Sequence, residues 1–376
     1  MPNIFNNIID NNIKPGTSFS RSNIEGSKKA IEFILGEKGY AFPTILVNVA
    51  LQDNKGLVDI DFRVDPKKKS FVRRINIKGN TKTNDEVYRR ELRQFESSTY
   101  SESKIQRSKI RLQRLKFVNQ VDVNKTIIDE NNGYIDIDFL LDETQSGEFK
   151  IGAGYSDSNG AIFNVKVQQD NFLGKGNNVA LELEKSSYKK LLRYRNTNPY
   201  FTEDGISKST SIVLSETDVS ETSTAAYISD TFAYGVDYNV PISEDRSYGY
   251  GAEIILTEYT TTIGSPTNVT NFLNEHGDSH FGIMFKANIV EDTRDRTVYA
   301  TQGKRQSITS NLFIKPDLDY SYTSIKFSGE YNTPYRLSFL DMFDWDTVFQ
   351  IKPQIGIGTG LFGESNLPFH DKYFAG

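Results

Sequence analysis

The stretch Ala161-Ile162-Phe163-Asn164-Val165-Lys166-Val167-Gln168 decides the fold class, because apolar and polar residues alternate along most of it. Successive side chains of a β-strand point to opposite faces, so its alternate apolar residues would share one face and its polar residues the other. The same alternation returns in later stretches, at 179–184, 232–240, 281–289 and 325–331. The sequence from residue 146 to residue 376 therefore predicts a large antiparallel β-sheet.

Two architectures fit this alternation. A soluble sandwich or barrel turns its apolar face inward, whereas a transmembrane β-barrel turns that face to lipid and keeps a polar lumen. The length of the segments, their terminal aromatic residues and the Lys, Glu and Gln in mid-strand favour the membrane barrel. We expect about eleven strands in this region, and an open sheet of eleven strands would leave unpaired edges in lipid.

Composition excludes several classes of protein. The chain has 376 residues and no cysteine, so it has neither disulfides nor thiolate metal sites. It lacks the run of about 18 apolar residues that a transmembrane helix needs. Basic residues are interleaved with acidic ones at a net charge of −5, so we expect no nucleic-acid partner. Residues 1–12 do not resemble a secretory signal, which for a membrane barrel predicts that the chain is part of a longer protein.

The part before the sheet contains an internal repeat. The stretch Asp59-Ile60-Asp61-Phe62 matches Asp136-Ile137-Asp138-Phe139, and residues 19–28 match residues 100–109. The second copy predicts a strand, two helices and two strands, at 71–78, 84–95, 101–115, 117–123 and 133–141. We therefore expect a partial domain at 1–67, a complete β-α-α-β-β domain at 68–145 and the sheet at 146–376.

These repeats resemble POTRA domains. The match lies in Ser70-Phe71-Val72-Arg73-Arg74-Ile75, in Gly79-Asn80 and in Arg89-Arg90-Glu91-Leu92-Arg93-Gln94. POTRA domains followed directly by a β-barrel are the plan of the superfamily for outer-membrane assembly and two-partner secretion. The resemblance implies tandem α+β POTRA domains followed by an incomplete antiparallel transmembrane β-barrel.

Two motifs in the sheet are similar to those of the BamA family, the central subunits of the bacterial outer-membrane β-barrel assembly machinery. The first is Gln168-Gln169-Asp170-Asn171-Phe172-Leu173-Gly174-Lys175-Gly176, and the second is Asn198-Pro199-Tyr200-Phe201 with Asp204-Gly205. This resemblance implies the latter part of a penultimate POTRA domain, the last POTRA domain and about eleven of sixteen barrel strands. The family's Val-Arg-Gly-Phe-type motif is expected just beyond Gly376, so the chain resembles a piece cut at both ends.

The sequence offers little for an enzyme. Its histidines, His276, His280 and His370, are scattered in predicted loops. No Gly-x-Ser-x-Gly and no phosphate-binding glycine loop occurs, and Gly152-x-Gly154 lies on a strand with no helix after it. We expect no catalytic residue, no metal and no cofactor.

The first predicted strand of the sheet is the main candidate site. It comprises Phe149, Lys150, Ile151, Gly152, Ala153, Gly154 and Tyr155. Its glycines indicate either a kink in the barrel or a place where another backbone approaches closely. The resemblance implies a lateral gate, in which this strand opens and pairs its backbone with an incoming client strand.

Glu96 is the second candidate. In the BamA family an acidic residue just past the Arg-Arg-Glu-Leu-Arg-Gln helix contributes to docking of the lipoprotein subunit BamD, and Glu96 holds the matching position. The alternative is an ordinary solvated carboxylate at a helix end, where it is slightly unfavourable.

The resemblance implies an outer-membrane insertase rather than an enzyme. It implies as partners unfolded outer-membrane proteins, BamD-like periplasmic lipoproteins, periplasmic chaperones and outer-membrane lipid, with the POTRA domains in the periplasm. The alternatives are a two-partner-secretion pore and a TamA-like translocation protein. An outer-membrane phospholipase or protease would need a Ser/His or Asp/His constellation, which this sequence does not offer.

Overall fold

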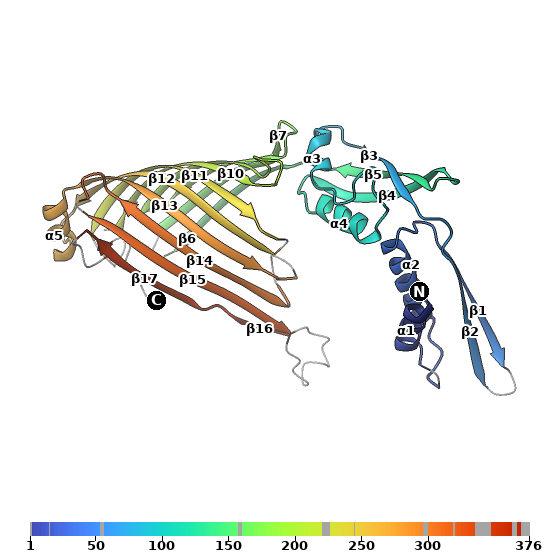
Figure 1. Cartoon of the computed structure of the whole chain (residues 1–376). Helices are drawn as coiled ribbons and strands as arrows, with labels where there is room; N and C mark the ends of the chain where they lie inside the picture. The colour runs from blue at the N-terminus through green and yellow to red at the C-terminus, as the bar shows by residue number, and fades with distance from the viewer. Residues whose placement is uncertain are drawn as a thin grey trace. The chain divides into compact units, whose positions relative to one another are not determined.

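A computed structural model describes residues 2–14, 16–52, 56–156, 160–219, 226–243, 245–295, 300–318, 320–334, 347–362 and 367–369. The chain divides into two compact units (Figure 1). The first contains Met1–Ser146 together with Leu173–Lys175, and the second contains Gly147–Phe172 and Gly176–Gly376. Within the described residues, every helix is too short or too polar to cross a membrane.

The first repeat of the first unit packs two helices against a hairpin. Helices α1 (Pro2–Asn12) and α2 (Arg21–Glu37) are followed by the antiparallel strands β1 (Thr44–Gln52) and β2 (Leu57–Asp65). Helix α2 begins where the Ser20 hydroxyl accepts a hydrogen bond from the Asn23 amide at 3.4 Å. The core forms where the apolar face of α2 meets the hairpin, at Ile31, Leu35 and Ile45.

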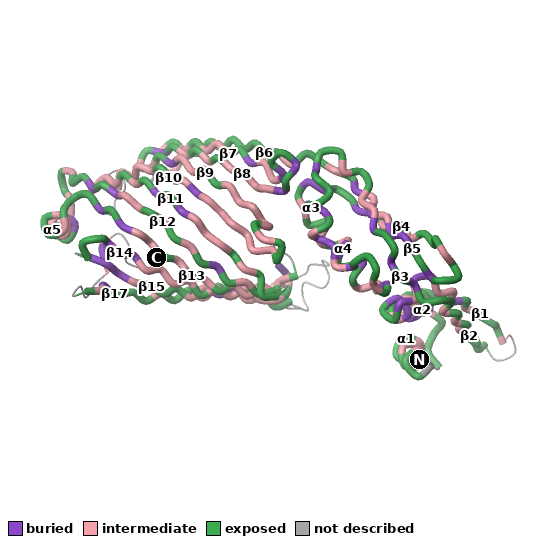
Figure 2. Tube along the Cα trace, turned by 45° about the horizontal axis from the view of Figure 1, so that its top comes forward, coloured by how far each residue is buried: buried purple, intermediate pink, exposed green. Residues whose placement is uncertain are grey.

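The second repeat has the expected β-α-α-β-β order. Its elements are β3 (Phe71–Lys78), α3 (Asp85–Arg89), α4 (Glu102–Gln113), β4 (Val118–Asp129) and β5 (Tyr134–Glu143). The sheet order is β3-β5-β4, with β3 parallel to β5 at one edge. Fully buried residues concentrate here, between the helices and the sheet, and include Tyr88, Leu112, Ile137 and Phe139 (Figure 2).

The prediction of a helix over residues 84–95 is wrong beyond Arg89, where α3 ends. After that residue the amides of Glu91 and Leu92 donate to carbonyls three residues back, which is the tighter geometry of a turn. The Arg93 amide donates instead to the Ser108 hydroxyl on α4, at 2.8 Å. A contact with α4 has therefore replaced a bond that would have continued the helix.

The last residue of α2 binds the start of α4. The Glu37 carboxylate accepts hydrogen bonds from the Ser103 hydroxyl at 2.8 Å, the Ser101 hydroxyl at 3.0 Å and the Ser103 amide. Burial alone would raise the pKa of Glu37, but the hydrogen bonds from Ser103 and Ser101 hold it below its usual value. Gly36 permits this approach, because a Cβ there would lie 2.6 Å from Cβ of Glu102. The two repeats are thus joined at a helix end.

The second unit is one antiparallel sheet of twelve strands in the described part of the chain. The strands are β6 (Gly147–Ser156), β7 (Gly160–Phe172), β8 (Asn177–Lys185), β9 (Lys189–Asn198), β10 (Ser207–Asp218), β11 (Tyr227–Pro241), β12 (Arg246–Thr261), β13 (Ser279–Asp292), β14 (Gly303–Ile314), β15 (Ser321–Pro334), β16 (Val348–Ile351) and β17 (Gln354–Leu361). Consecutive strands pair, except that β16 and β17 both pair with β15. The break between them lies at Pro353, whose carbonyl accepts a bond from the Gly329 amide at 2.9 Å.

The sheet is open, with β6 at one edge and β16 and β17 at the other (Figure 1). Because β16 and β17 share one partner, the sheet has eleven positions across its width, in line with the expected count. The described structure thus has the expected two-part plan, in which small α+β repeats are followed by one open antiparallel sheet.

The sequence analysis missed the helix α5 (Thr267–His276), which interrupts the long connection between β12 and β13. Phe272 on α5 packs against Tyr320 with ring centroids 5.1 Å apart, and against the almost fully buried His280 at 5.5 Å. Aromatic packing therefore fixes this connection, which the sequence pattern indicated only as a loop.

Candidate functional site

Strand β6 forms an edge of the large sheet. Among the described residues its strand partner is β7 alone, in a register that runs from Gly147 opposite Gln169 to Ser156 opposite Gly160. An edge strand presents one row of backbone N–H and C=O groups without a strand partner. The site predicted at 149–155 therefore lies where another extended chain could form hydrogen bonds.

The residues of β6 are exposed along most of the strand. Every residue from Gly147 to Tyr155 is exposed, and the side chains that alternate toward one face include Phe149, Ile151 and Tyr155, with exposures of 64%, 70% and 77%. Lys150 forms an ion pair with Glu148 at 2.7 Å, on the same strand and also well exposed. The edge is thus apolar on one face and lightly charged on the other.

The two glycines of β6 leave space rather than adopt a special backbone conformation. A Cβ at Gly154 would meet nothing within 4 Å, and one at Gly152 would reach only Cβ of Asn164, at 3.9 Å. Neither residue has a positive φ. The strand therefore needs no glycine to fold here, and what the glycines provide is an uncovered backbone.

Glu96 lies against another edge strand, β3. Its carboxylate accepts a hydrogen bond from the Ile75 amide at 2.8 Å, and the Arg89 guanidinium lies 3.7 Å from the same oxygen. Arg89 also donates to the Ile75 carbonyl at 3.2 Å. Because α3 ends at Arg89, Glu96 is not at a helix end, and about half of its side chain is exposed.

Glu143, which the sequence analysis did not single out, organises the loop after β3. The amides of Thr81, Lys82 and Thr83 donate to its carboxylate at 2.9, 2.9 and 3.1 Å, and the Tyr88 hydroxyl donates at 2.7 Å. Burial alone would raise the pKa of Glu143, but these donors lower it to about 2. The carboxylate is therefore the fixed centre of this loop.

The motif Gln169, Asp170, Asn171, Phe172 and Gly174 covers the end of β7 and part of the turn to β8. The Asn171 side-chain oxygen accepts a bond from the Gly176 amide at 2.7 Å, and Asp170 accepts one from Gln168 at 2.8 Å.

Gly174 belongs by its contacts to the first unit. Its carbonyl accepts a bond from the Asn84 amide at 2.9 Å, and a Cβ on it would lie 2.4 Å from the Lys82 carbonyl oxygen. Glycine is needed here for space and for its φ of +71°.

The motif Asn198, Pro199, Tyr200 and Phe201 forms the turn from β9 to β10. The Asn198 side chain accepts a bond from the Tyr200 amide at 3.0 Å, and the Phe201 amide donates to the Ile206 carbonyl at 2.8 Å. The Phe201 ring lies 4.8 Å from the Lys208 ammonium. Both motifs thus shape turns, and neither assembles a catalytic constellation.

The fold and these turns agree with family comparisons. The model described as the Omp85 superfamily domain matches residues 171–376, more than half of the chain. The POTRA model, described as a surface antigen variable number repeat, matches residues 3–67 and 70–144. The chain therefore belongs to the Omp85 superfamily of outer-membrane barrel proteins with POTRA domains, which confirms the expected localisation.

Within this superfamily, the chain is similar to proteins called BamA. The outer membrane protein assembly factor BamA of Neisseria meningitidis is 27% identical over 374 residues, which are 97% of this chain and 46% of that protein. BamA of Buchnera aphidicola is 30% identical over 190 residues, which are 50% of this chain and 31% of that protein.

Among solved structures, BamA of Haemophilus ducreyi lacking POTRA domains 1–3 matches with a TM-score of 0.77 at 25% identity. The match covers 100% of this chain and 71% of that one. The resemblance to BamA is confirmed.

Proposed function

We propose that this protein is an outer-membrane assembly factor, which folds β-barrel proteins and inserts them into the bacterial outer membrane without chemical turnover. The exposed edge of β6 carries the proposal. A nascent barrel has unpaired strand edges, and in lipid each unsatisfied backbone group is costly. A template edge lowers this cost by pairing with the client strand before the client barrel closes.

Residues 149–155 are the proposed lateral gate. The strand from Phe149 to Tyr155 offers backbone groups for β-augmentation, and its exposed apolar side chains face the same environment as those of a client strand. No side chain needs to react, so the protein is not an enzyme in this proposal. Unfolded outer-membrane proteins are the clients, and outer-membrane lipid is the medium.

The repeats at 1–67 and 68–145 are the proposed periplasmic part, preceding the barrel region at 146–376. They would receive clients from periplasmic chaperones and dock a BamD-like lipoprotein near Glu96. A partner's cation could reach the exposed half of the Glu96 carboxylate while the other half stays bonded to Ile75.

Disulfide capture tests the gate. Residues 1–376 contain no cysteine, so Ile151→Cys places one thiol in this part of the full-length protein, and any cysteine outside it is first replaced by serine. Reconstituted in liposomes, it should form a disulfide with a client barrel that carries one cysteine in its terminal strand. Residues directly opposite in an antiparallel pair lie about 4.5–5.5 Å apart at Cα, which a disulfide can bridge.

Leu181→Cys on β8 is the matched control, because Leu181 is also exposed but its strand is paired on both sides. It should capture no client. Equal capture at both positions would mean that contact is unspecific and that β6 is no gate. Passage of an extended chain through the lumen, without membrane insertion, would favour the two-partner-secretion or TamA-like alternative.

A further inference from the structure

A shallow apolar groove crosses the large sheet near the β8–β9 hairpin, with a volume of about 750 Å³. Its floor is a row of side chains on consecutive strands, each opposite the next in the strand register. The row consists of Val165, Leu183, Leu192, Leu214, Phe232 and Leu256. These residues lie on the apolar face of the sheet, so the groove opens toward the side predicted to contact lipid.

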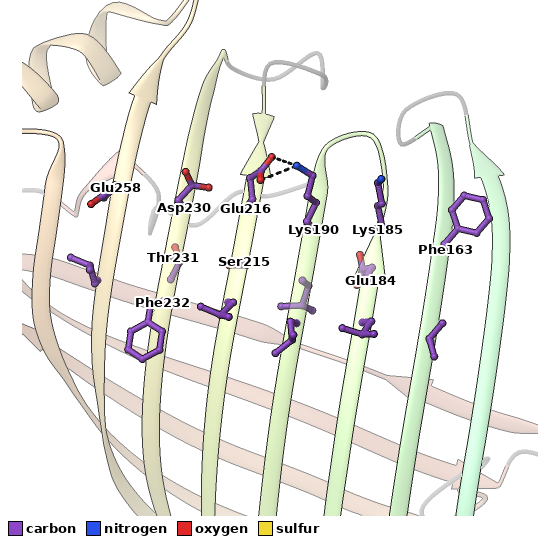
Figure 3. A pocket seen from close by; sticks show the side chains of 16 residues that line it. Phe163, Glu184, Lys185, Lys190, Ser215, Glu216, Asp230, Thr231, Phe232 and Glu258 are labelled. Carbon is purple, nitrogen blue, oxygen red and sulfur yellow. Dashed lines mark hydrogen bonds and ion pairs between the residues drawn. The ribbon is translucent and has the colours of Figure 1, made fainter.

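A row of charged residues borders this floor at the hairpin end. Lys185, Lys190, Glu216, Asp230 and Glu258 occupy successive strands from β8 to β12, and each is opposite the next (Figure 3). Each lies two residues along its strand from the apolar floor, hence on the same face. The groove therefore combines an apolar floor with one charged margin.

The charges in this margin are sorted by sign. The two lysines lie on β8 and β9, and the three carboxylates lie on β10, β11 and β12. The sign changes between Lys190 and Glu216, where the Lys190 ammonium lies 2.7 and 2.9 Å from the two carboxylate oxygens. Both side chains of this pair are about half exposed, so solvent weakens their attraction and a ligand can compete for it.

We propose that this groove binds one lipid whose headgroup carries both a phosphate and a primary ammonium, as in an ethanolamine phospholipid. The acyl chains lie along the apolar floor, the phosphate binds Lys185 and Lys190, and the ammonium binds Glu216 and Asp230. Neighbouring strands are about 4.8 Å apart, which suits a phosphate and an amine joined through two carbons. The volume lies within the range of about 300–1,000 Å³ for small-molecule sites.

Charge complementarity favours this lipid over other occupants. The margin has two positive and three negative groups, so a headgroup with only phosphates would meet repulsion from the carboxylates. In the described part of the chain neither Asp230 nor Glu258 forms an ion-pair contact, and Asp230 acts on Lys190 as a nearby charge, so both carboxylates can accept from an ammonium. A protein strand is a poorer fit, because β8 to β11 are already paired on both sides.

Native mass spectrometry of the full-length protein in detergent tests the site. Phosphatidylethanolamine, phosphatidylcholine and phosphatidylglycerol with identical acyl chains are offered separately. We expect one phosphatidylethanolamine per protein, bound about tenfold more tightly than either other lipid. Phosphatidylcholine has no N–H to donate to the carboxylates, and phosphatidylglycerol has no cation.

The variant Glu216→Gln with Asp230→Asn should remove that preference. Asp237→Asn is the matched control, since Asp237 lies on the same strand as Asp230 but on the opposite face, and it should retain the preference. Equal binding of all three lipids would overturn the proposal and leave only general lipid contact. Tighter binding of a bisphosphorylated glycolipid, lost on chelation of Mg²⁺, would overturn it in favour of a cation-bridged anionic lipid.

The lipid site rests on this face contacting the membrane and does not depend on the assembly activity. Client capture at Ile151 and lipid binding at Asp230 are measured on strands far apart in the sheet order. A protein that captures clients without selecting a lipid would therefore keep the proposed function and lose only this inference.

Discussion

Two edge strands of the chain, β3 and β6, differ in how their backbones are covered. On β3, the amide of Ile75 donates to Glu96 and its carbonyl accepts from Arg89. The Val72 amide donates to the Ser98 carbonyl, and the Val72 carbonyl accepts from the Ser97 amide. On β6, every residue from 147 to 155 is exposed, and within the described residues β7 is the only strand partner. One edge is closed by the side chains and backbone around it, and the other is left open.

The covered edge of β3 meets a requirement of folding, whereas the uncovered edge of β6 matches the proposed function. Uncovered edges invite aggregation, and proteins usually cover them, twist them away or place charges on them. The second repeat follows that rule by using a carboxylate 21 residues from the amide it binds. Within the described residues β6 has no such cover, and its alternate side chains on one face are apolar. This edge is where the proposed gate would pair with a client strand.

The largest effect should come from proline scanning along β6. Proline cannot donate a backbone hydrogen bond, and alternate residues of an edge strand point their amides outward. Substitutions at Phe149, Lys150, Ile151 and Gly152 should therefore alternate in effect. The variants that remove an outward-pointing amide should lower client insertion into liposomes about tenfold. Their thermal unfolding should show that the fold is intact.

The intervening proline variants serve as the control, because they remove bonds between β6 and β7 and should lower stability instead. Loss of activity without this alternation would mean that the outward amides of β6 are not the binding groups.

A smaller effect is expected when Glu143→Gln removes the carboxylate beneath the loop at 81–83. The NH₂ group of Gln would face the backbone N–H groups that now donate to the carboxylate, so we expect a loss of about 1–2 kcal/mol in local stability. Hydrogen exchange of the Thr81, Lys82 and Thr83 amides in the full-length protein measures it. Exchange on β6 serves as the internal reference, because the donors to Glu143 described above all belong to the first unit.

The same site predicts a pH dependence. The pKa of Glu143 is about 2 when folded and near 4.5 when unfolded, so its stabilisation is complete above 4.5 and is lost as the pH falls toward 2. The protection factors of the amides at 81–83, which correct for the slower intrinsic exchange in acid, should fall over that window in the native protein and not in Glu143→Gln. An equal fall in both would assign the acid response to another group.

The smallest effect should come from Glu96, where two variants separate its roles. Glu96→Ala leaves the Ile75 amide without its side-chain acceptor and should cost about 1 kcal/mol, measured by hydrogen exchange at Ile75. Glu96→Gln keeps an acceptor and removes the charge, so it should preserve stability. If Glu96 docks a lipoprotein through its charge, Glu96→Gln should weaken docking as much as Glu96→Ala.

Glu86→Ala, an exposed carboxylate nearby in the sequence, is the control for both measurements. Docking that survives Glu96→Gln and fails only with Glu96→Ala would show that Glu96 acts by closing the β3 edge and not by binding the partner.

The sequence predicted the parts of the structure that depend on local pattern. Alternation at 161–168 and 232–240 identified strands β7 and β11, because the period of two is a property of a single strand. The repeated Asp-Ile-Asp-Phe identified β2 and β5. The open sheet followed from counting such segments.

The sequence did not predict features that depend on contacts between distant residues. The residues from Arg90 to Gln94 have the composition of a helix, but the hydroxyl of Ser108 takes the Arg93 amide. The margin from Lys185 to Glu258 becomes one row only when the register of five strands is known. Register is set by the hairpins and by packing, so neither the lipid groove nor the role of Glu143 was visible beforehand.

The hydrogen bonds from the start of α4 to Glu37 couple the folding stability of the second repeat to that of the first. A helix start leaves backbone amides unsatisfied, and here one of the carboxylates that meets them is supplied by the preceding repeat. In an array of this kind, stability is the sum of each repeat and of the interfaces between neighbours. Ser101 remains the N-cap of α4, but unfolding of α2 withdraws the Glu37 acceptor from the Ser103 amide, so the repeats should melt in one transition. A mechanical load on the first repeat is therefore carried to the helices of the second.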